Sequence, residues 1–151
     1  KRTRKNLSRQ SLTMLYFSLI NPYLDYCNII WANQKKIYTD RLYKRQKRAV
    51  RVITNSKWNS HSAPLFKQLN ILNVFDINFV QTGCFVYRFT HGMLPPMFDN
   101  YFVRNSSFNN YDSIHRDDLH LPRARTCLRA NTIRISGVKT WNSLSDLIKQ
   151  K

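Results

Sequence analysis

The sequence predicts a mainly α protein: a small bundle of four to six helices with an irregular or short-stranded C-terminal tail. Three observations support this fold class. The 151 residues include only three Gly and five Pro, so few positions break a helix. Apolar residues recur at helical spacing in the first half of the chain. Hydrophobic residues make up 42% of the chain, enough for the core of one ordinary domain or two small ones.

The first predicted element is an amphipathic helix over residues 7–20, which follows a basic arm at residues 1–6. Asn21 and Pro22 are predicted to end this helix and start another, because Asn is a good N-cap and Pro fits the first helical position. The segment that follows, YLDYCNIIWA, is apolar on most sides and is predicted to belong to the core.

The third predicted helix, residues 37–54, contains the run KRQKRAVR, which places five positive charges in eight positions. A helical wheel separates two faces. The face predicted to dock on a core consists of Tyr38, Leu42, Gln46, Ala49 and Ile53. The opposite face, roughly 120° wide, consists of Arg41, Lys44, Lys47, Arg48 and Arg51, with Arg45 at its border. The charge run is therefore predicted to be one outward face of a docked helix.

Shorter elements complete the helical part. HSAP is predicted to cap and start a short helix that ends at Leu69, and residues 75–90 form an apolar helix predicted to be central. His91-Gly92 ends that helix, and a short helix follows the prolines of LPPMFDNYF.

The tail differs in composition. Residues 103–126 are polar and predicted to form a long loop or strap, ANTIRISG has the alternation of a strand, and VKTWNSLSDLIKQK is predicted to be a last amphipathic segment. The composition shift predicts two parts: a helical domain at 1–102, and a basic strap with a C-terminal extension at 103–151, packed on it.

The charge balance indicates a polyanionic partner. The chain carries 25 Lys and Arg against eight acidic residues, all of them Asp, for a net charge of +17. Such an uncompensated field attracts nucleic acid or an anionic membrane surface. Cations along one helix face release counterions from phosphates, so the outward face is predicted to contact a nucleic-acid backbone. A second basic cluster is Arg123, Arg125, Arg129 and Arg134, near Tyr101, Phe108 and Tyr111, which are able to stack on bases.

Catalytic and metal sites are not predicted. The spacing of His115, His120 and Cys127 matches no zinc pattern, Asp117-Asp118 is predicted to pair locally with Arg116, and there is no Gly-rich phosphate loop. The three cysteines are far apart and odd in number, which indicates a reducing compartment, nuclear or cytoplasmic. No apolar run reaches membrane-spanning length. We therefore expect no cofactor and no small-molecule substrate.

Two alternatives remain open from the residues alone. The chain could be a basic helical interaction module that binds a protein partner or an anionic surface, with KRQKRAVR as a nuclear-import signal. Alternatively, it could be a small enzyme with His91, His115 or His120 as acid or base.

Six segments over residues 10–149 together resemble one family. They are, in order, YFSLINPYLDYCNIIWAN, RLYKRQKRAVRVI, HSAPLFKQLNILNVFDI, LPPMFDNYF, LHLPRART and GVKTWNSL. Their order and spacing resemble the region that follows the catalytic palm in non-LTR retrotransposon reverse transcriptases of the jockey-like and chicken-repeat-like groups. The resemblance implies a thumb with a C-terminal extension, part of a longer polypeptide, that holds the RNA template and the primer–template duplex.

The resemblance also assigns positions. The family's Gln-Lys-Arg helix corresponds to Gln46, Lys47 and Arg48. Its Leu-Pro-Arg-x-Arg-Thr strap corresponds to Leu121, Pro122, Arg123, Arg125 and Thr126. Its Lys-x-Trp-Asn-x-Leu element corresponds to Lys139, Trp141, Asn142 and Leu144. Arg116 occupies the place of the arginine in the family's Asn-Thr-Arg motif. Arg116, Arg123, Arg125 and Lys139 thereby join the helix face as predicted nucleic-acid contacts.

The polymerase signature of the family, an aromatic residue followed by two aspartates, has no counterpart here, because Asp117-Asp118 follows Arg116. The resemblance therefore implies a non-catalytic part of an RNA-directed DNA polymerase. Its partners would be an RNA template or RNA–DNA duplex and a palm domain upstream, and Mg²⁺ is expected only in that palm.

Overall fold

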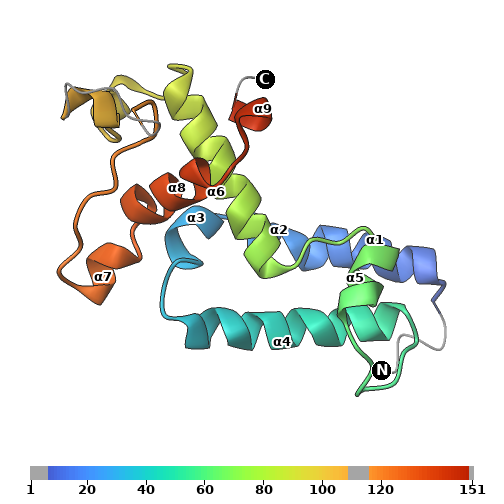
Figure 1. The fold of residues 1–151 in the computed structure, drawn as a ribbon. Helices are drawn as coiled ribbons and strands as arrows, with labels where there is room; N and C mark the ends of the chain where they lie inside the picture. The colour runs from blue at the N-terminus through green and yellow to red at the C-terminus, as the bar shows by residue number, and fades with distance from the viewer. Residues whose placement is uncertain (1–6, 109–115, 150–151) are drawn as a thin grey trace. The chain divides into compact units, whose positions relative to one another are not determined.

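The computed structural model describes residues 7–108 and 116–149 (Figure 1). All regular secondary structure in these two ranges is helical, which confirms the mainly α class. The four helices of seven residues or more are α1 (Arg9–Leu19), α4 (Lys36–Ile53), α6 (Val74–Thr90) and α8 (Ile133–Asn142). The chain forms two compact units, residues 1–78 and 79–151. The division into domains at 102/103 differs from these units and stays a prediction.

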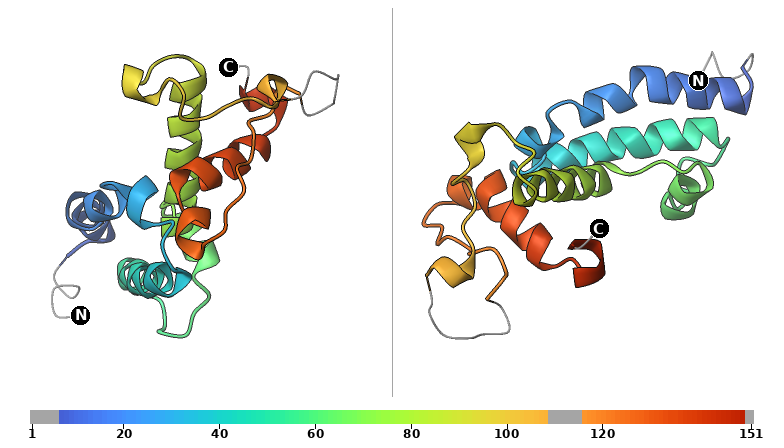
Figure 2. Two further views of the ribbon diagram at one scale, coloured as in Figure 1. Left: turned by 90° about the vertical axis from the view of Figure 1, so that its left-hand side faces the viewer. Right: turned by 90° about the horizontal axis from the view of Figure 1, so that it is seen from above.

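The first unit is built on α1 and α4, which lie side by side (Figures 1 and 2). Ser8 caps α1, where its hydroxyl accepts a hydrogen bond of 3.1 Å from the Ser11 amide, and an N-cap bond of this kind stabilises a helix by about 1 kcal/mol. The predicted helices over 7–20 and 37–54 are both confirmed. One buried core cluster of this unit consists of Tyr16, Val50, Ile53, Phe66 and Ile71, and a second consists of Leu24, Val74 and Ile77.

Phe66 comes from α5 (Ala63–Gln68), the short helix predicted after HSAP, which has a proline in its first turn. The segment after α1 forms α2 (Asn21–Asp25), also with Pro22 in its first turn, and α3 (Asn28–Trp31). The prediction that this segment is core is confirmed only in part: Leu24 is buried with Val74 and Ile77, whereas Tyr23 and Tyr26 are 81% and 78% exposed. Cys27 has a left-handed φ of 50°, which separates α2 from α3. The apolar residues of the segment therefore do not lie on one helix face.

Gln46 connects three parts of the first unit. Its side chain is 2% exposed, and its Nε2 donates hydrogen bonds of 2.8 Å to the Tyr16 hydroxyl and to the Leu72 carbonyl. Its Oε1 accepts a 3.0 Å bond from the amide of Val74, the first residue of α6. Burial raises the pKa of Tyr16, and the bond from Gln46 partly opposes that shift. One amide therefore joins α1, α4 and the start of α6.

The apolar helix predicted over 75–90 is confirmed as α6. The helix is buried on one side and not all round. Val86 is fully buried in the second unit, whereas Phe79 and Val80 are about half exposed and Cys84 is exposed too. A helix with neighbours on one side buries a stripe rather than its whole surface.

The second unit contains a helix where a strand was predicted. The segment ANTIRISG contains the last residue of the one-turn helix α7 (Cys127–Ala130) and the first residues of α8. The buried residues Ile135, Val138 and Trp141 recur every third position, and this helical period extends further than the short alternation that suggested a strand. The core consists of Val86, Phe102, Leu119, Val138 and Trp141. A one-turn α9 (Asp146–Lys149) follows.

The predicted strap is confirmed over its described residues. These residues include the 3₁₀ turn η3 (Asn105–Ser107). Before the strap, the short helix predicted after the prolines is the 3₁₀ turn η2 (Pro96–Phe98). Asn142 of α8 fixes the strap by two bonds: its Oδ1 accepts from the Leu119 amide at 3.2 Å and its Nδ2 donates to the Leu119 carbonyl at 2.9 Å. Leu119 also forms an isolated antiparallel bridge with Arg104, the one strand-like pairing of the described tail.

Two glycines inside helices of this unit give opposite predictions for substitution by alanine. A Cβ at Gly137 would lie 3.1 Å from both Phe102 Cζ and Val86 Cγ2, whereas one at Gly83 would meet nothing nearer than Leu144 Cδ1 at 4.0 Å. Gly83→Ala should raise the free energy of unfolding by about 0.5–1 kcal/mol through helix propensity. Gly137→Ala should lower it by about 1–2 kcal/mol, because overpacking outweighs the same gain. Urea denaturation of both variants checks the signs, and equal effects would contradict the close packing of α8.

Candidate nucleic-acid interface

The buried stripe of α4 is rotated by roughly 60° from the predicted one. Its inward side chains are Thr39, Tyr43, Gln46, Val50 and Ile53, spaced alternately by four and three residues. Tyr38 and Leu42, which were predicted to dock, are exposed, so that part of the prediction is wrong. The wheel was centred on Leu42, and the half-polar Thr39 and Tyr43 gave no signal that they were the inward residues.

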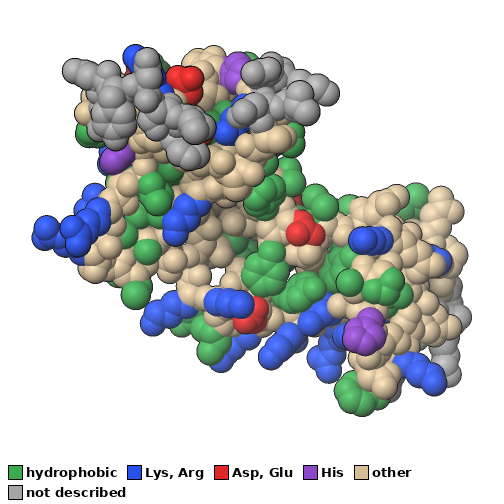
Figure 3. All heavy atoms as spheres, viewed as in Figure 1, with side chains coloured by type: hydrophobic (Ala, Val, Ile, Leu, Met, Phe, Trp, Pro, Cys, Tyr) green, Lys and Arg blue, Asp and Glu red, His purple; other side chains and the backbone are tan. Residues whose placement is uncertain are grey.

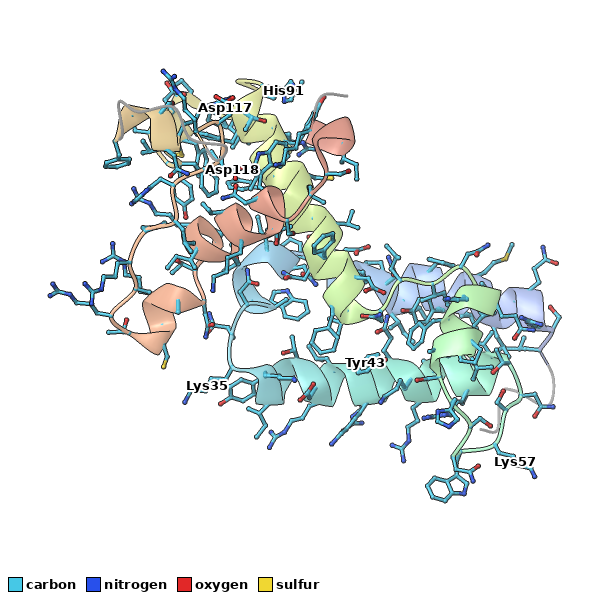
Figure 4. The ribbon with its side chains drawn as sticks, viewed as in Figure 1. Lys35, Tyr43, Lys57, His91, Asp117 and Asp118 are labelled. Atoms are coloured by element: carbon cyan, nitrogen blue, oxygen red, sulfur yellow. The ribbon has the colours of Figure 1, made fainter. Side chains whose placement is uncertain are left out.

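The rotation changes which cations face outward. Arg41, Lys44, Arg45 and Arg48 are all exposed, and their spacing of i, i+3, i+4 and i+7 makes one continuous stripe. Arg45, placed at the border by the sequence, belongs to it. Figure 3 shows Lys and Arg side chains gathered along α4, and Figure 4 shows Tyr43 on the opposite side of the helix.

Lys47 and Arg51 lie at the edge of this stripe and are half-buried. The Lys47 ammonium lies 4.4 Å from the centre of the Tyr43 ring, a cation–π contact. Arg51 donates from Nε at 3.0 Å and from Nη2 at 2.8 Å to the carbonyl of Ser60. Arg51 therefore holds the loop after α4 while it keeps its positive charge.

An open groove of about 730 Å³ lies between that loop and α4. The groove is lined by Lys44, Lys47, Arg48, Arg51, Val52, Trp58 and Asn59, which we call the α4 groove. Trp58 is 87% exposed, an unusual state for the largest apolar side chain. An indole beside four cations is able to stack on a base while the cations contact phosphates.

Sequence reasoning missed Trp58. The sequence held a signal for it, because Trp58 stands between Lys57 and Asn59 in a polar segment that has no other apolar residue at helical spacing. No Asp or Glu is among the residues that line the α4 groove.

The second basic cluster lines a pocket of about 460 Å³ in the second unit. We call it the strap pocket, and it is lined by Tyr101, Phe102, Val103, Phe108, His120, Pro122, Arg123, Arg125, Arg129 and Arg134. The predicted proximity of Tyr101 and Phe108 to these arginines is confirmed, whereas Tyr111 lies outside the described residues. Two of the predicted contacts are not part of this lining: Arg116 is exposed on the strap and Lys139 is exposed on α8.

The described members of the acidic pair and of the histidines have separate surroundings. The Asp118 carboxylate (labelled in Figure 4) lies 3.5 Å from the Lys149 ammonium. His91 stacks on Tyr87 with ring centres 4.0 Å apart, and His120 packs on Phe108 at 4.3 Å; His115 lies outside the described residues. Within residues 7–108 and 116–149, no three His, Cys, Asp or Glu side chains group as metal ligands.

A third concave surface is apolar. A groove of about 380 Å³ lies between α1 and α4 and is lined mainly by aliphatic side chains such as Leu15, Leu19 and Val52. Its lining also includes Arg45 and Arg48, two cations of the exposed stripe on α4. Among the described helices, none combines the length and the apolar character needed to cross a membrane.

No protein-family model, curated protein or solved structure matches this chain. We therefore infer function from the geometry of the α4 groove and the strap pocket, together with the family resemblance of the six sequence segments.

Proposed function

We propose that this chain is a non-catalytic, thumb-like part of a non-LTR retrotransposon reverse transcriptase that grips the backbone of an RNA template or RNA–DNA duplex. The observation that supports it best is the α4 groove, where four cations and an exposed Trp58 share one concavity. A palm domain elsewhere in the same polypeptide would supply the polymerase chemistry and its Mg²⁺.

The dimensions of the stripe fit a phosphate backbone. Arg41 and Arg48 are seven residues apart, which is about 10 Å along a helix axis. Over that distance along its axis, one strand of a duplex contains about three phosphates. Lys and Arg side chains recognise these phosphates without reading the bases, so the proposed grip depends on shape and charge rather than on sequence.

Fluorescence of Trp58 tests this proposal. Titration of the chain with a 20-nucleotide RNA, alone or paired with complementary DNA, should quench tryptophan emission, because Trp58 is exposed while Trp141 is buried and Trp31 is half-buried. In Trp58→Phe the quenching should nearly disappear, while anisotropy of a labelled RNA should still report binding, weakened by about tenfold or less.

Trp31→Phe is the matched control, and it should keep the quenching of the unmodified chain. Quenching that persists in Trp58→Phe would place the nucleic acid elsewhere. Absence of RNA binding, combined with binding to anionic phosphatidylserine vesicles at the same salt concentration, would contradict the proposal and favour an interaction module for anionic surfaces.

A further inference from the structure

We infer that the strap pocket binds one unpaired nucleotide of a single-stranded nucleic acid, with its base against the aromatic side chains and its phosphates on the arginines. This second site goes beyond the proposed grip on a backbone, because it would require a base that is free of its partner strand. Three properties of the pocket support the inference: its arginines, its aromatic side chains and its size.

The arginines come from three neighbouring segments. Arg123 and Arg125 belong to the strap, Arg129 to α7 and Arg134 to α8, and all four are exposed while they line one pocket. No Asp or Glu is among the described residues that line the pocket. A guanidinium presents a planar fork of donors that matches two phosphate oxygens, so this arrangement favours a phosphate over a simple halide ion.

The aromatic side chains offer a surface for a base. Phe108 is 60% exposed, and its ring packs on His120 with centres 4.3 Å apart, which leaves ring surface open to solvent. Tyr101 is half-buried, and the Arg134 guanidinium lies 5.9 Å from its ring centre. Burial raises the pKa of Tyr101, although Arg134 opposes the shift, so the phenol stays neutral and does not repel a phosphate.

The size and shape favour an unpaired base. A pocket of about 460 Å³ is within the range that holds a small ligand, and it is far smaller than the cross-section of a duplex. A base inside a duplex already has both faces covered by its neighbours, whereas an unpaired base is free to stack on an aromatic ring. Such stacking tolerates any base, so the pocket would select single strands without selecting a sequence.

The test uses the full chain and a 12-nucleotide single strand with a central 2-aminopurine, prepared as RNA and as DNA, and each strand again in a duplex. Phe108→Ala should lower the affinity for the single strands by about 5- to 100-fold and abolish the change in 2-aminopurine fluorescence. Arg125→Gln with Arg129→Gln should lower the same affinity by at least tenfold at low salt. The affinity for the duplexes should change less than threefold in both variants.

Met97→Ala and Arg88→Gln are the matched controls, since both side chains are exposed in the same unit and neither lines the pocket. They should leave single-strand affinity unchanged. Equal losses for single strands and duplexes, or equal effects of the pocket variants and the controls, would overturn the inference. The proposed grip of the α4 groove would stand in that case, because it predicts the duplex affinity and the quenching of Trp58 independently.

Discussion

Replacement of Lys44, Lys47, Arg48 and Arg51 together by glutamine should reduce the slope of log affinity against log salt concentration by about 3 to 4 units. Each cation that contacts a phosphate releases close to one counterion, and all four of these residues line the α4 groove. At low salt the affinity for RNA or an RNA–DNA duplex should fall by several hundredfold or more. Anisotropy of a labelled duplex, measured across a salt series, checks both values.

A charge-matched control separates this groove from the general positive field of the chain. Arg9, Lys35, Lys36 and Lys67 are exposed in the same unit and lie outside the groove, so their joint replacement by glutamine removes the same charge. That variant should change the slope by less than about 1 unit. Equal slope changes in the two variants would show that the binding depends on net charge and would contradict the groove.

Arg51 requires its own check, because it also bonds to the Ser60 carbonyl. The triple variant that keeps Arg51 should still lower the slope by about 3 units. A triple variant that behaves like the unmodified chain would mean that the loop, and not the cations, determines the affinity.

Gln46→Ala should lower the free energy of unfolding by about 3–5 kcal/mol. The substitution removes the partner of the Val74 amide, the Leu72 carbonyl and the Tyr16 hydroxyl, and an unsatisfied buried group costs about 1–3 kcal/mol. It also leaves a cavity where a 2% exposed side chain was packed. Chemical denaturation followed by circular dichroism measures the loss.

Tyr16→Phe is the matched control, since it removes only one of the three bonds and keeps the ring in the core. It should cost about 1 kcal/mol. A Gln46→Ala variant no less stable than Tyr16→Phe would contradict the role of the amide as a connection between α1, α4 and α6.

The motif Gln46-Lys47-Arg48 illustrates how far the sequence reaches. The resemblance implies a nucleic-acid contact for this motif, which stays a prediction, whereas the helix itself is predicted correctly. In the structure the three side chains have different surroundings: Gln46 is buried, Lys47 packs on Tyr43 and Arg48 is exposed. Adjacent residues on a helix differ by about 100°, so one motif necessarily divides between the core and the surface.

The sequence by itself determined the helical class, the bounds of α1, α4 and α5, and the presence of a cationic face. These properties depend on local spacing, capping and charge, which are written in neighbouring residues. Tertiary structure alone decided that α4 turns Thr39 and Tyr43 inward. It also brought Trp58 to the cations of the α4 groove. These outcomes depend on which distant side chains share a core, and no local pattern encodes that choice.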